Sequence, residues 1–151
     1  MKYAIIACAC AVLLGSSGCK KEGPVPASHV PALTEIFGEW QWVSSVGGLT
    51  GKQVETPPAG SEYTYQFDRD SSFVECHNGQ CSVPGKFSLR MEKSLLFGDQ
   101  RLTLVLRRNT GSVVERTRYL VEEILDELRI NDDSPDGFGN RYVRKGAHLN
   151  Q

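Results

Sequence analysis

Residues 37–45 alternate between apolar and polar side chains, and this alternation constrains the fold more strongly than any other stretch. Trp40 and Trp42 lie two positions apart, so in an extended strand both rings point to one side, while Gln41 points to the other. Alternation with a period of two is typical of a strand that buries one face. We therefore expect residues 37–45 to open an antiparallel sheet that carries both tryptophans on its core side.

Seven later stretches also have the character of short strands, and turn residues separate most of them. They span 62–68, 73–77, 80–90, 101–107, 114–123, 125–131 and 140–145. Most connections are short, so consecutive strands are expected to be neighbours in the sheet. The pattern predicts an all-β fold, an eight-stranded antiparallel up-and-down barrel, which leaves no open edge. A helix over 122–128 is the alternative for one stretch, because Ile124, Leu125 and Leu128 also fit helical spacing.

Two of the connections are longer than the others. The Gly- and Pro-rich loop over 46–60 is the longest, and it fits a lid or rim over an opening as well as it fits a crossover without a role. Residues 91–100 form the second connection, in which Leu95, Leu96 and Phe97 are candidates for a short extra strand. The first connection therefore bears on function and the second on the number of strands.

The first 18 residues predict an export signal. Lys2 precedes an apolar run over 3–14, and small residues follow over 15–18, an arrangement typical of a secretory signal peptide. Cys19 comes next, and small residues directly before a cysteine resemble the lipobox of bacterial lipoproteins. In that class the cysteine is acylated and becomes the mature N-terminus, so the resemblance implies that membrane lipid holds the chain through Cys19.

The number of cysteines favours acylation. Of the five cysteines, Cys8 and Cys10 leave with the signal peptide, and lipid on Cys19 then leaves Cys76 and Cys81 as one pair. A plain signal peptide that leaves Cys19 as a free thiol is the alternative. That alternative is disfavoured because it leaves an odd number of free cysteines in the exported chain.

The residues after Cys19 bear on location and domain limits. Lys20 stands where inner-membrane lipoproteins carry a retention aspartate, so the chain resembles lipoproteins sorted to the outer membrane of the cell envelope. Residues 19–36 contain three prolines and no regular period, which predicts an extended tether. The domain is expected over 37–145, followed by a frayed tail over 146–151. Whether the domain faces the periplasm or the cell surface stays open.

Asn78 and Gly79 form a strong hairpin signal, since both central positions of a type I′ turn require positive φ. A two-residue loop pairs His77 with Gln80 and places Cys76 opposite Cys81 at the closer, non-hydrogen-bonded spacing. That spacing and an oxidising compartment predict a Cys76–Cys81 disulfide. A metal site from Cys76, His77 and Cys81 is the less favoured alternative, because it lacks a fourth ligand and its three ligands point to both faces.

Composition and spacing argue against several functional classes. A formal charge of −1 offers no basic excess for a phosphate backbone, so no nucleic-acid partner is expected. The three histidines, His29, His77 and His148, lie in the tether, the hairpin and the tail. No nucleophile motif or paired-carboxylate spacing stands out, so we expect no enzyme and no catalytic residue. The acidic stretch 131–137 fails the calcium-loop pattern at Pro135, and no metal or cofactor is expected.

Several short motifs follow one another in an order typical of one family. They are Gly38-x-Trp40, Trp42-Val43-Ser44-Ser45-x-Gly47-Gly48, Thr56-Pro57 before an aromatic strand, and Asp136-Gly137-Phe138 before Tyr142-x-Arg144. On these motifs residues 37–145 resemble lipocalin-like bacterial lipoproteins. In lipocalins an arginine near the chain end covers a first-strand tryptophan at the barrel base, which implies this role for Trp40 and Arg144 beside Gly38. The resemblance also implies a small apolar ligand in the barrel mouth.

The interior of so small a barrel is expected to be crowded. An eight-stranded barrel holds side chains or one small ligand, and each aromatic ring covers a large area. The residues proposed to line a ligand cup are Trp42, Tyr63, Tyr65, Phe67, Phe73, Phe87 and Tyr142. We expect a shallow cup that binds or carries a small apolar ligand. A protein-interaction module of the cell envelope with a filled barrel is the alternative.

The acylation hypothesis predicts that Cys19→Ala releases the protein from membranes. Several acyl chains on one residue anchor a protein strongly, because each buried CH₂ contributes about 0.8 kcal/mol. Fractionation of cells that express the variant should move the protein from the membrane pellet to the soluble fraction. A variant that stays in the pellet through a wash that strips peripheral proteins would contradict the hypothesis.

Overall fold

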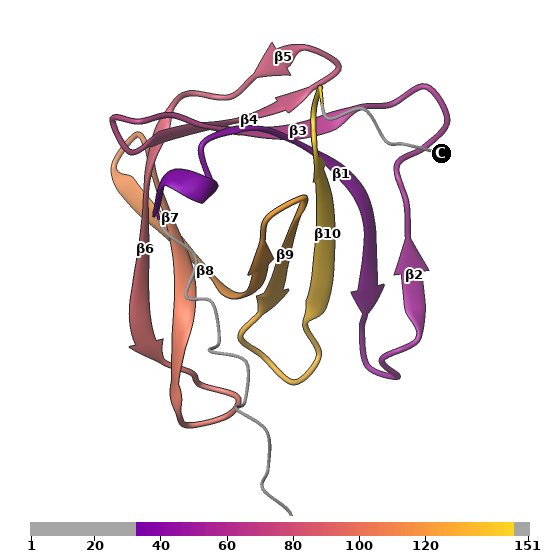
Figure 1. Ribbon diagram of the computed structural model, residues 1–151, viewed down its shortest axis with the longest axis vertical. Coiled ribbons are helices and arrows are strands. Elements are labelled where there is room, and N and C mark those ends of the chain that lie inside the picture. The colour runs from indigo at the N-terminus through magenta and orange to yellow at the C-terminus, as the bar shows by residue number, and fades with distance from the viewer. Residues whose placement is uncertain (1–32, 147–151) are drawn as a thin grey trace, which may run out of the picture.

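Residues 33–146, the part of the chain that the computed structural model describes, form a closed antiparallel barrel (Figure 1). A 3-10 helix, η1 (Leu33–Glu35), precedes the first strand. The strands are β1 (Gly38–Gly47), β2 (Gln53–Glu55), β3 (Tyr63–Phe67), β4 (Ser72–His77), β5 (Gln80–Cys81), β6 (Gly85–Lys93), β7 (Gln100–Thr110), β8 (Val113–Ile124), β9 (Glu127–Asp132) and β10 (Phe138–Arg144).

The order of the strands confirms the predicted topology. When the short strands β2 and β5 are left out, eight strands remain, and each pairs with the strands before and after it in the chain. The last of them, β10, also pairs with β1 and closes the ring. The fold is therefore the all-β, eight-stranded antiparallel up-and-down barrel expected from the sequence. Within residues 33–146, no helix has the length and apolar character needed to cross a membrane. The predicted signal peptide, Cys19, most of the tether and residues 147–151 of the tail lie outside the described residues.

Three local expectations are resolved by the strand register. Residues 122–128 form the end of β8, a turn and the start of β9, with Ile124 opposite Leu128, so the helical alternative is wrong. The expected extra strand at 95–97 is also wrong, because a turn lies there between β6 and β7. The 46–60 loop is not purely irregular, since it contains β2, which pairs with the end of β1.

Trp40 lies at one end of the barrel under a lid of backbone and guanidinium groups. Its ring is fully buried, and its Nε1–H donates a hydrogen bond to the carbonyl of Ile36 at 2.7 Å. The guanidinium of Arg144 stacks 4.1 Å from the ring centroid and donates to the carbonyls of Glu35 and Phe37, each at 2.7 Å. Ile36 is fully buried as well, so the domain begins a few residues before the boundary expected at 37.

Gly38 is required beneath this lid. Its φ of +121° is one that side-chain-bearing residues rarely adopt, and a Cβ at this position would lie 2.9 Å from Arg144 Nη1. The resemblance to lipocalins implied that Gly38, Trp40 and Arg144 lie together at the barrel base. In the structure Arg144 lies against both Trp40 and Gly38. We refer to this end, defined by Ile36, Gly38, Trp40 and Arg144, as the closed end.

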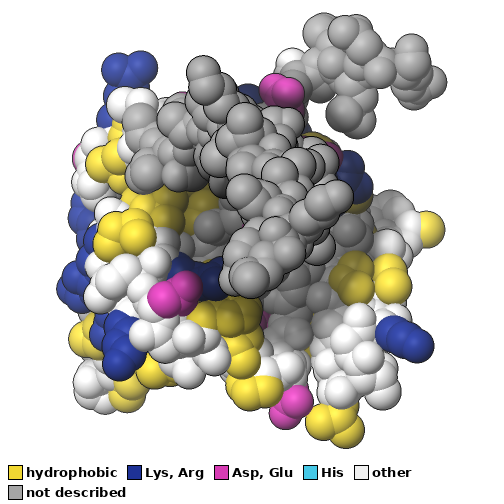
Figure 2. All heavy atoms as spheres, turned by 60° about the horizontal axis from the view of Figure 1, so that its bottom comes forward, with side chains coloured by type: hydrophobic (Ala, Val, Ile, Leu, Met, Phe, Trp, Pro, Cys, Tyr) yellow, Lys and Arg dark blue, Asp and Glu magenta, His cyan; other side chains and the backbone are white. Residues whose placement is uncertain are grey.

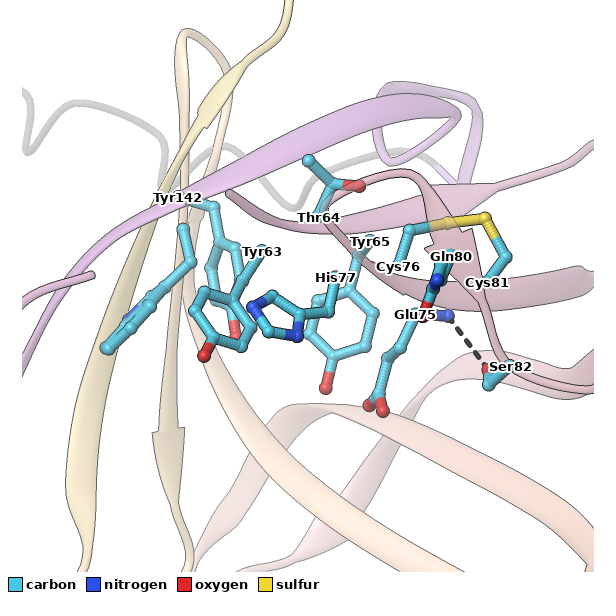
Figure 3. A pocket seen from close by; sticks show the side chains of 11 residues that line it. Tyr63, Thr64, Tyr65, Glu75, Cys76, His77, Gln80, Cys81, Ser82 and Tyr142 are labelled. Carbon is cyan, nitrogen blue, oxygen red and sulfur yellow. Dashed lines mark hydrogen bonds between the residues drawn. A yellow bond between two sulfur atoms is a disulfide. The ribbon is translucent and has the colours of Figure 1, made fainter. Parts of the chain in front are cut away.

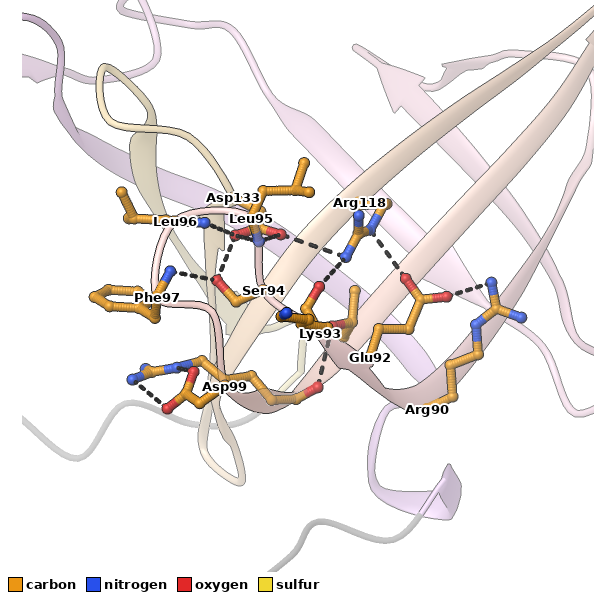
Figure 4. A network of polar contacts seen from close by, with 12 residues as sticks. Arg90, Glu92, Lys93, Ser94, Leu95, Leu96, Phe97, Asp99, Arg118 and Asp133 are labelled. Carbon is orange, nitrogen blue, oxygen red and sulfur yellow. Dashed lines mark hydrogen bonds and ion pairs between the residues drawn. The ribbon is translucent and has the colours of Figure 1, made fainter.

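The buried carboxylate of Asp133 holds the turn between β6 and β7 by hydrogen bonds (Figure 4). The Asp133 carboxylate, directly after β9, accepts hydrogen bonds from Ser94 Oγ at 2.6 Å, from the Leu95 amide at 2.9 Å and from the Leu96 amide at 3.1 Å. Arg118 Nη2 lies 3.3 Å from the same carboxylate. The pKa of Asp133 lies below its ordinary value: burial alone would raise it, and these hydrogen bonds with the charge of Arg118 outweigh burial.

Asp133→Asn should destabilise the barrel by about 1–3 kcal/mol at neutral pH, because the amide keeps only one of the two acceptor oxygens and loses the charge that pairs with Arg118. A carboxyl whose folded-state pKa is depressed stabilises the fold above its ordinary pKa, and loses that contribution as the pH falls through the lower folded value. Urea unfolding at pH 7 and at about pH 3 should therefore show a smaller difference between wild type and variant in acid. An equal difference at both pH values would contradict the assignment.

Trp40→Ala should cost about 3–5 kcal/mol of unfolding free energy, because it empties the most deeply placed ring site of the closed end. Trp42→Ala is the matched control, since Trp42 is only half-buried and its removal should cost less. Denaturant unfolding followed by circular dichroism measures both changes. Equal stability of Trp40→Ala and wild type would contradict the placement of this ring.

Candidate functional site

A cavity of about 600 Å³ opens among β1, β3, β4, β5 and β10, and we call it the cup (Figure 3). The register pairs Tyr65 with Glu75 and Tyr63 with His77, so these four side chains share one face of the sheet. Figure 3 shows them pointing to the same side, with Thr64 and the disulfide on the other side. The lining residues are Trp42, Tyr63, Thr64, Tyr65, Glu75, Cys76, His77, Gln80, Cys81, Ser82 and Tyr142.

Three rings form an ordered aromatic wall of the cup. Tyr63 and His77 stack in parallel, with centroids 4.2 Å apart and planes 8° apart. The Trp42 ring meets Tyr63 edge to face at 5.6 Å and 87°. Both arrangements are favourable for π-systems, so the wall presents flat surfaces in fixed orientations.

A bulge in β1 fixes the Trp42 ring. The register between β1 and β10 shifts between Trp42 and Ser44, and the inward face passes from Trp42 to Ser45, which is buried. Trp42 Nε1–H donates to Ser45 Oγ at 2.9 Å, and Ser45 Oγ–H donates to Asn140 Oδ1 at 2.6 Å. The bulge therefore turns a serine inward to hold the indole at the rim of the cup.

The floor of the cup consists of buried tyrosines and one ion pair. The ring centroids of Tyr65 and Tyr142 lie 5.3 Å apart, and both residues are nearly fully buried. Burial raises the pKa of each hydroxyl above its ordinary value, and for Tyr65 the neighbouring Tyr142, Tyr119 and Glu75 raise the pKa further. The hydroxyls are therefore neutral at physiological pH, and the Glu75 carboxylate lies close enough to Tyr65 to act on its pKa.

Glu75 also forms an ion pair with Arg108 of β7. The Arg108 guanidinium lies 5.0 Å from the centroid of the Phe73 ring, and Arg108 is not among the residues that line the cup. The side chain of Glu75 is 38% exposed and that of Arg108 is 25% exposed. The carboxylate is therefore accessible from the cup, and a cation outside the cup lining forms an ion pair with it.

The predicted Cys76–Cys81 disulfide is formed, and β5 pairs with β4 in the expected register. Because the two sulfurs are bonded to each other, they are not free thiolates, and the alternative metal site with His77 is wrong. The bridge holds β5 against the end of β4. Ser82 then donates its amide to the Glu75 carbonyl at 2.8 Å, and its Oγ accepts from the Glu75 amide at 3.2 Å.

The structure divides the seven rings that the sequence assigned to the cup. Trp42, Tyr63, Tyr65 and Tyr142 line it. The other three form a filled core next to the closed end. The ring centroid of Phe67 lies 6.2 Å from that of Phe73 and 4.9 Å from that of Phe87. Sequence reasoning assigned all seven rings to the inner face and had no measure of depth along the barrel. These three phenyl rings therefore belong to the core and not to the cup.

The cup predicted from the sequence did not include five polar lining residues. They are Thr64, Glu75, His77, Gln80 and Ser82. The alternation of β4 carried a usable signal for two of them, since Glu75 and His77 follow the inward Phe73 at intervals of two. Within residues 33–146, His, Cys, Asp and Glu side chains do not form a group of three or more that could hold a metal ion.

Comparisons of the chain with protein-family models, with curated proteins and with solved structures find no match. The chemistry of the cup therefore rests on its own geometry. Its volume lies within the range of about 300–1,000 Å³ typical of small-molecule sites. It combines an aromatic wall with a few convergent polar groups, a combination that suits stacking and hydrogen bonding to a small ligand.

Proposed function

We propose that the domain is a lipocalin-like binding protein that is anchored by lipid in the bacterial cell envelope and holds a small, flat ligand in the cup. The observation that carries the proposal is the ordered wall of Trp42, Tyr63 and His77 beside an open cavity of about 600 Å³. Flat aromatic surfaces that are already fixed cost little conformational entropy when a ligand stacks on them. The wall therefore favours binding over a purely structural role.

The filled core sets the size of the ligand. Phe67, Phe73 and Phe87 occupy the interior next to Trp40, and leucine and isoleucine side chains complete that core. A ligand in the cup therefore rests on Tyr65 and Tyr142 and does not pass further along the barrel. This supports a carrier or sensor for one small molecule and argues against a deep calyx for a long acyl chain.

Two features support the lipocalin-like part of the proposal. The barrel is up-and-down with eight strands, and Arg144 covers Trp40 beside Gly38. Guanidinium stacking on an indole is a favourable cation–π contact that stabilises such an end. Anchoring through Cys19 in the outer membrane remains part of the proposal on the sequence alone, because Cys19 lies outside the described residues.

The surface gives less support to the alternative of an interaction module. Leu49, Leu95 and Phe97 are among the exposed large apolar side chains. Figure 2 shows hydrophobic side chains on one face in separate groups, with charged and other polar side chains between them. Scattered apolar side chains are ordinary on protein surfaces, so the cup is the stronger candidate for function.

A fluorescence titration with N-phenyl-1-naphthylamine tests the proposal. This neutral, flat probe becomes fluorescent in apolar sites, so we expect a saturable increase with the wild-type protein. Tyr63→Ala should weaken binding by about three- to tenfold, because one aromatic contact contributes about 0.5–1.5 kcal/mol. Leu95→Ala, on an exposed turn outside the cup, is the control and should leave binding unchanged.

Two results of this titration would count against the cup. The first is the absence of saturable binding by the folded wild-type protein. The second is binding that Leu95→Ala weakens and Tyr63→Ala leaves intact, because the probe would then occupy an exposed apolar turn.

A further inference from the structure

We infer that the cup takes flat aromatic ligands whose polar head is neutral and donates hydrogen bonds, and that it rejects ligands with an anionic head. This inference rests on the proposed binding function and adds the class of ligand. It is carried by the position of the Glu75 carboxylate between the aromatic wall and Arg108.

Glu75 sets the charge that a ligand encounters in the cup. Among the lining residues it is the one acidic side chain, and Lys and Arg do not occur among them. Its carboxylate points into the same space as the rings of Tyr63, Tyr65 and His77 (Figure 3). A ligand that stacks on the wall therefore brings its polar end towards a carboxylate, which accepts hydrogen bonds and cannot donate them.

Arg108 forms an ion pair with this carboxylate from outside the cup lining. Its guanidinium also lies over the Phe73 ring. The pair is already neutral overall, so a second anion in the cup would find no compensating cation. A carboxylate has about four acceptor sites on its two oxygens. Arg108 uses some of them, and the remainder are available to a donor from the cup.

The tyrosine hydroxyls do not reverse this preference. Tyr65 lies close enough to Glu75, Tyr119 and Tyr142 for these groups to raise its pKa. Burial keeps all three hydroxyls in the neutral form by raising the pKa of each. The Glu75 carboxylate lies beside Tyr65 as an acceptor, so an anionic head would compete with it for the hydroxyl proton and gain little compensation for lost water.

The wall specifies the body of the ligand. The Tyr63–His77 stack and the edge-on Trp42 leave flat faces and edges in fixed positions. Ser45 and Asn140 hold Trp42 by hydrogen bonds, so the wall does not have to reorganise for each ligand. A fused aromatic ring with an amide, amine or phenol-type donor at one end fits both parts of the cup.

The test uses two probes with the same ring and nearly the same shape, 2-naphthamide and 2-naphthoate. At neutral pH the first carries a neutral N–H donor and the second a carboxylate. We expect the wild-type protein to bind 2-naphthamide at least about tenfold more tightly than 2-naphthoate, a difference measured by calorimetry or probe displacement. Equal or tighter binding of 2-naphthoate would overturn the inference and leave the binding function intact.

Two variants locate the source of the preference. Glu75→Gln keeps the shape and removes the charge, so the preference for the amide should fall to about threefold or less, or reverse towards 2-naphthoate beside the unpaired Arg108. Arg108→Gln is the matched variant, and it should keep or increase the preference because Glu75 then lacks its cation. If Glu75→Gln does not fold, Arg108→Gln alone decides the question.

The remaining outcomes are also distinct. A preference that survives unchanged in folded Glu75→Gln, or that is lost in folded Arg108→Gln, would overturn the assignment to Glu75. Failure of the wild-type protein to bind 2-naphthamide, 2-naphthoate or N-phenyl-1-naphthylamine would remove the binding function itself, and the inference with it.

Discussion

The contact between Trp40 and Arg144 is the constraint on which the barrel depends. These two residues come from the first and last strands, which pair with each other to close the ring. The same guanidinium donates to the carbonyls of Glu35 and Phe37, and the indole N–H donates to Ile36. One pair of side chains therefore joins both ends of the domain and satisfies buried backbone carbonyls, which are costly to leave unpaired.

Closure at this end makes an open site possible farther along the barrel. Phe67, Phe73 and Phe87 fill the interior beside Trp40 and supply the packed core that a small domain needs. Tyr65 and Tyr142 then mark the level at which the interior changes from apolar packing to polar groups. Beyond that level the barrel no longer has to be filled for stability, and the cup occupies the remaining space.

The sequence predicts the direction of a side chain better than its height in the barrel. The short connections predicted the strand order, alternation in β1 and β3 predicted the inward rings, and the Asn78-Gly79 turn predicted the disulfide register. Alternation could not distinguish Phe67 in the core from Tyr63 in the cup, because both side chains point inward from the same strand, β3. The bulge that turns Ser45 inward and the Glu75–Arg108 pair depend on strand pairing and on long-range contacts. The spacing of residues along one strand therefore predicts neither the bulge nor the ion pair.

We propose that Trp40 belongs to a sealed end and Trp42 to a ligand site, and NMR can distinguish the two indoles directly. The chain has two tryptophans, so a ¹⁵N-labelled sample gives two indole N–H signals. During titration with 2-naphthamide we expect a saturable shift of the Trp42 indole signal and no shift of the Trp40 signal. A shift of Trp40 with Trp42 unchanged, or no shift of either signal at saturating ligand, would contradict this proposal.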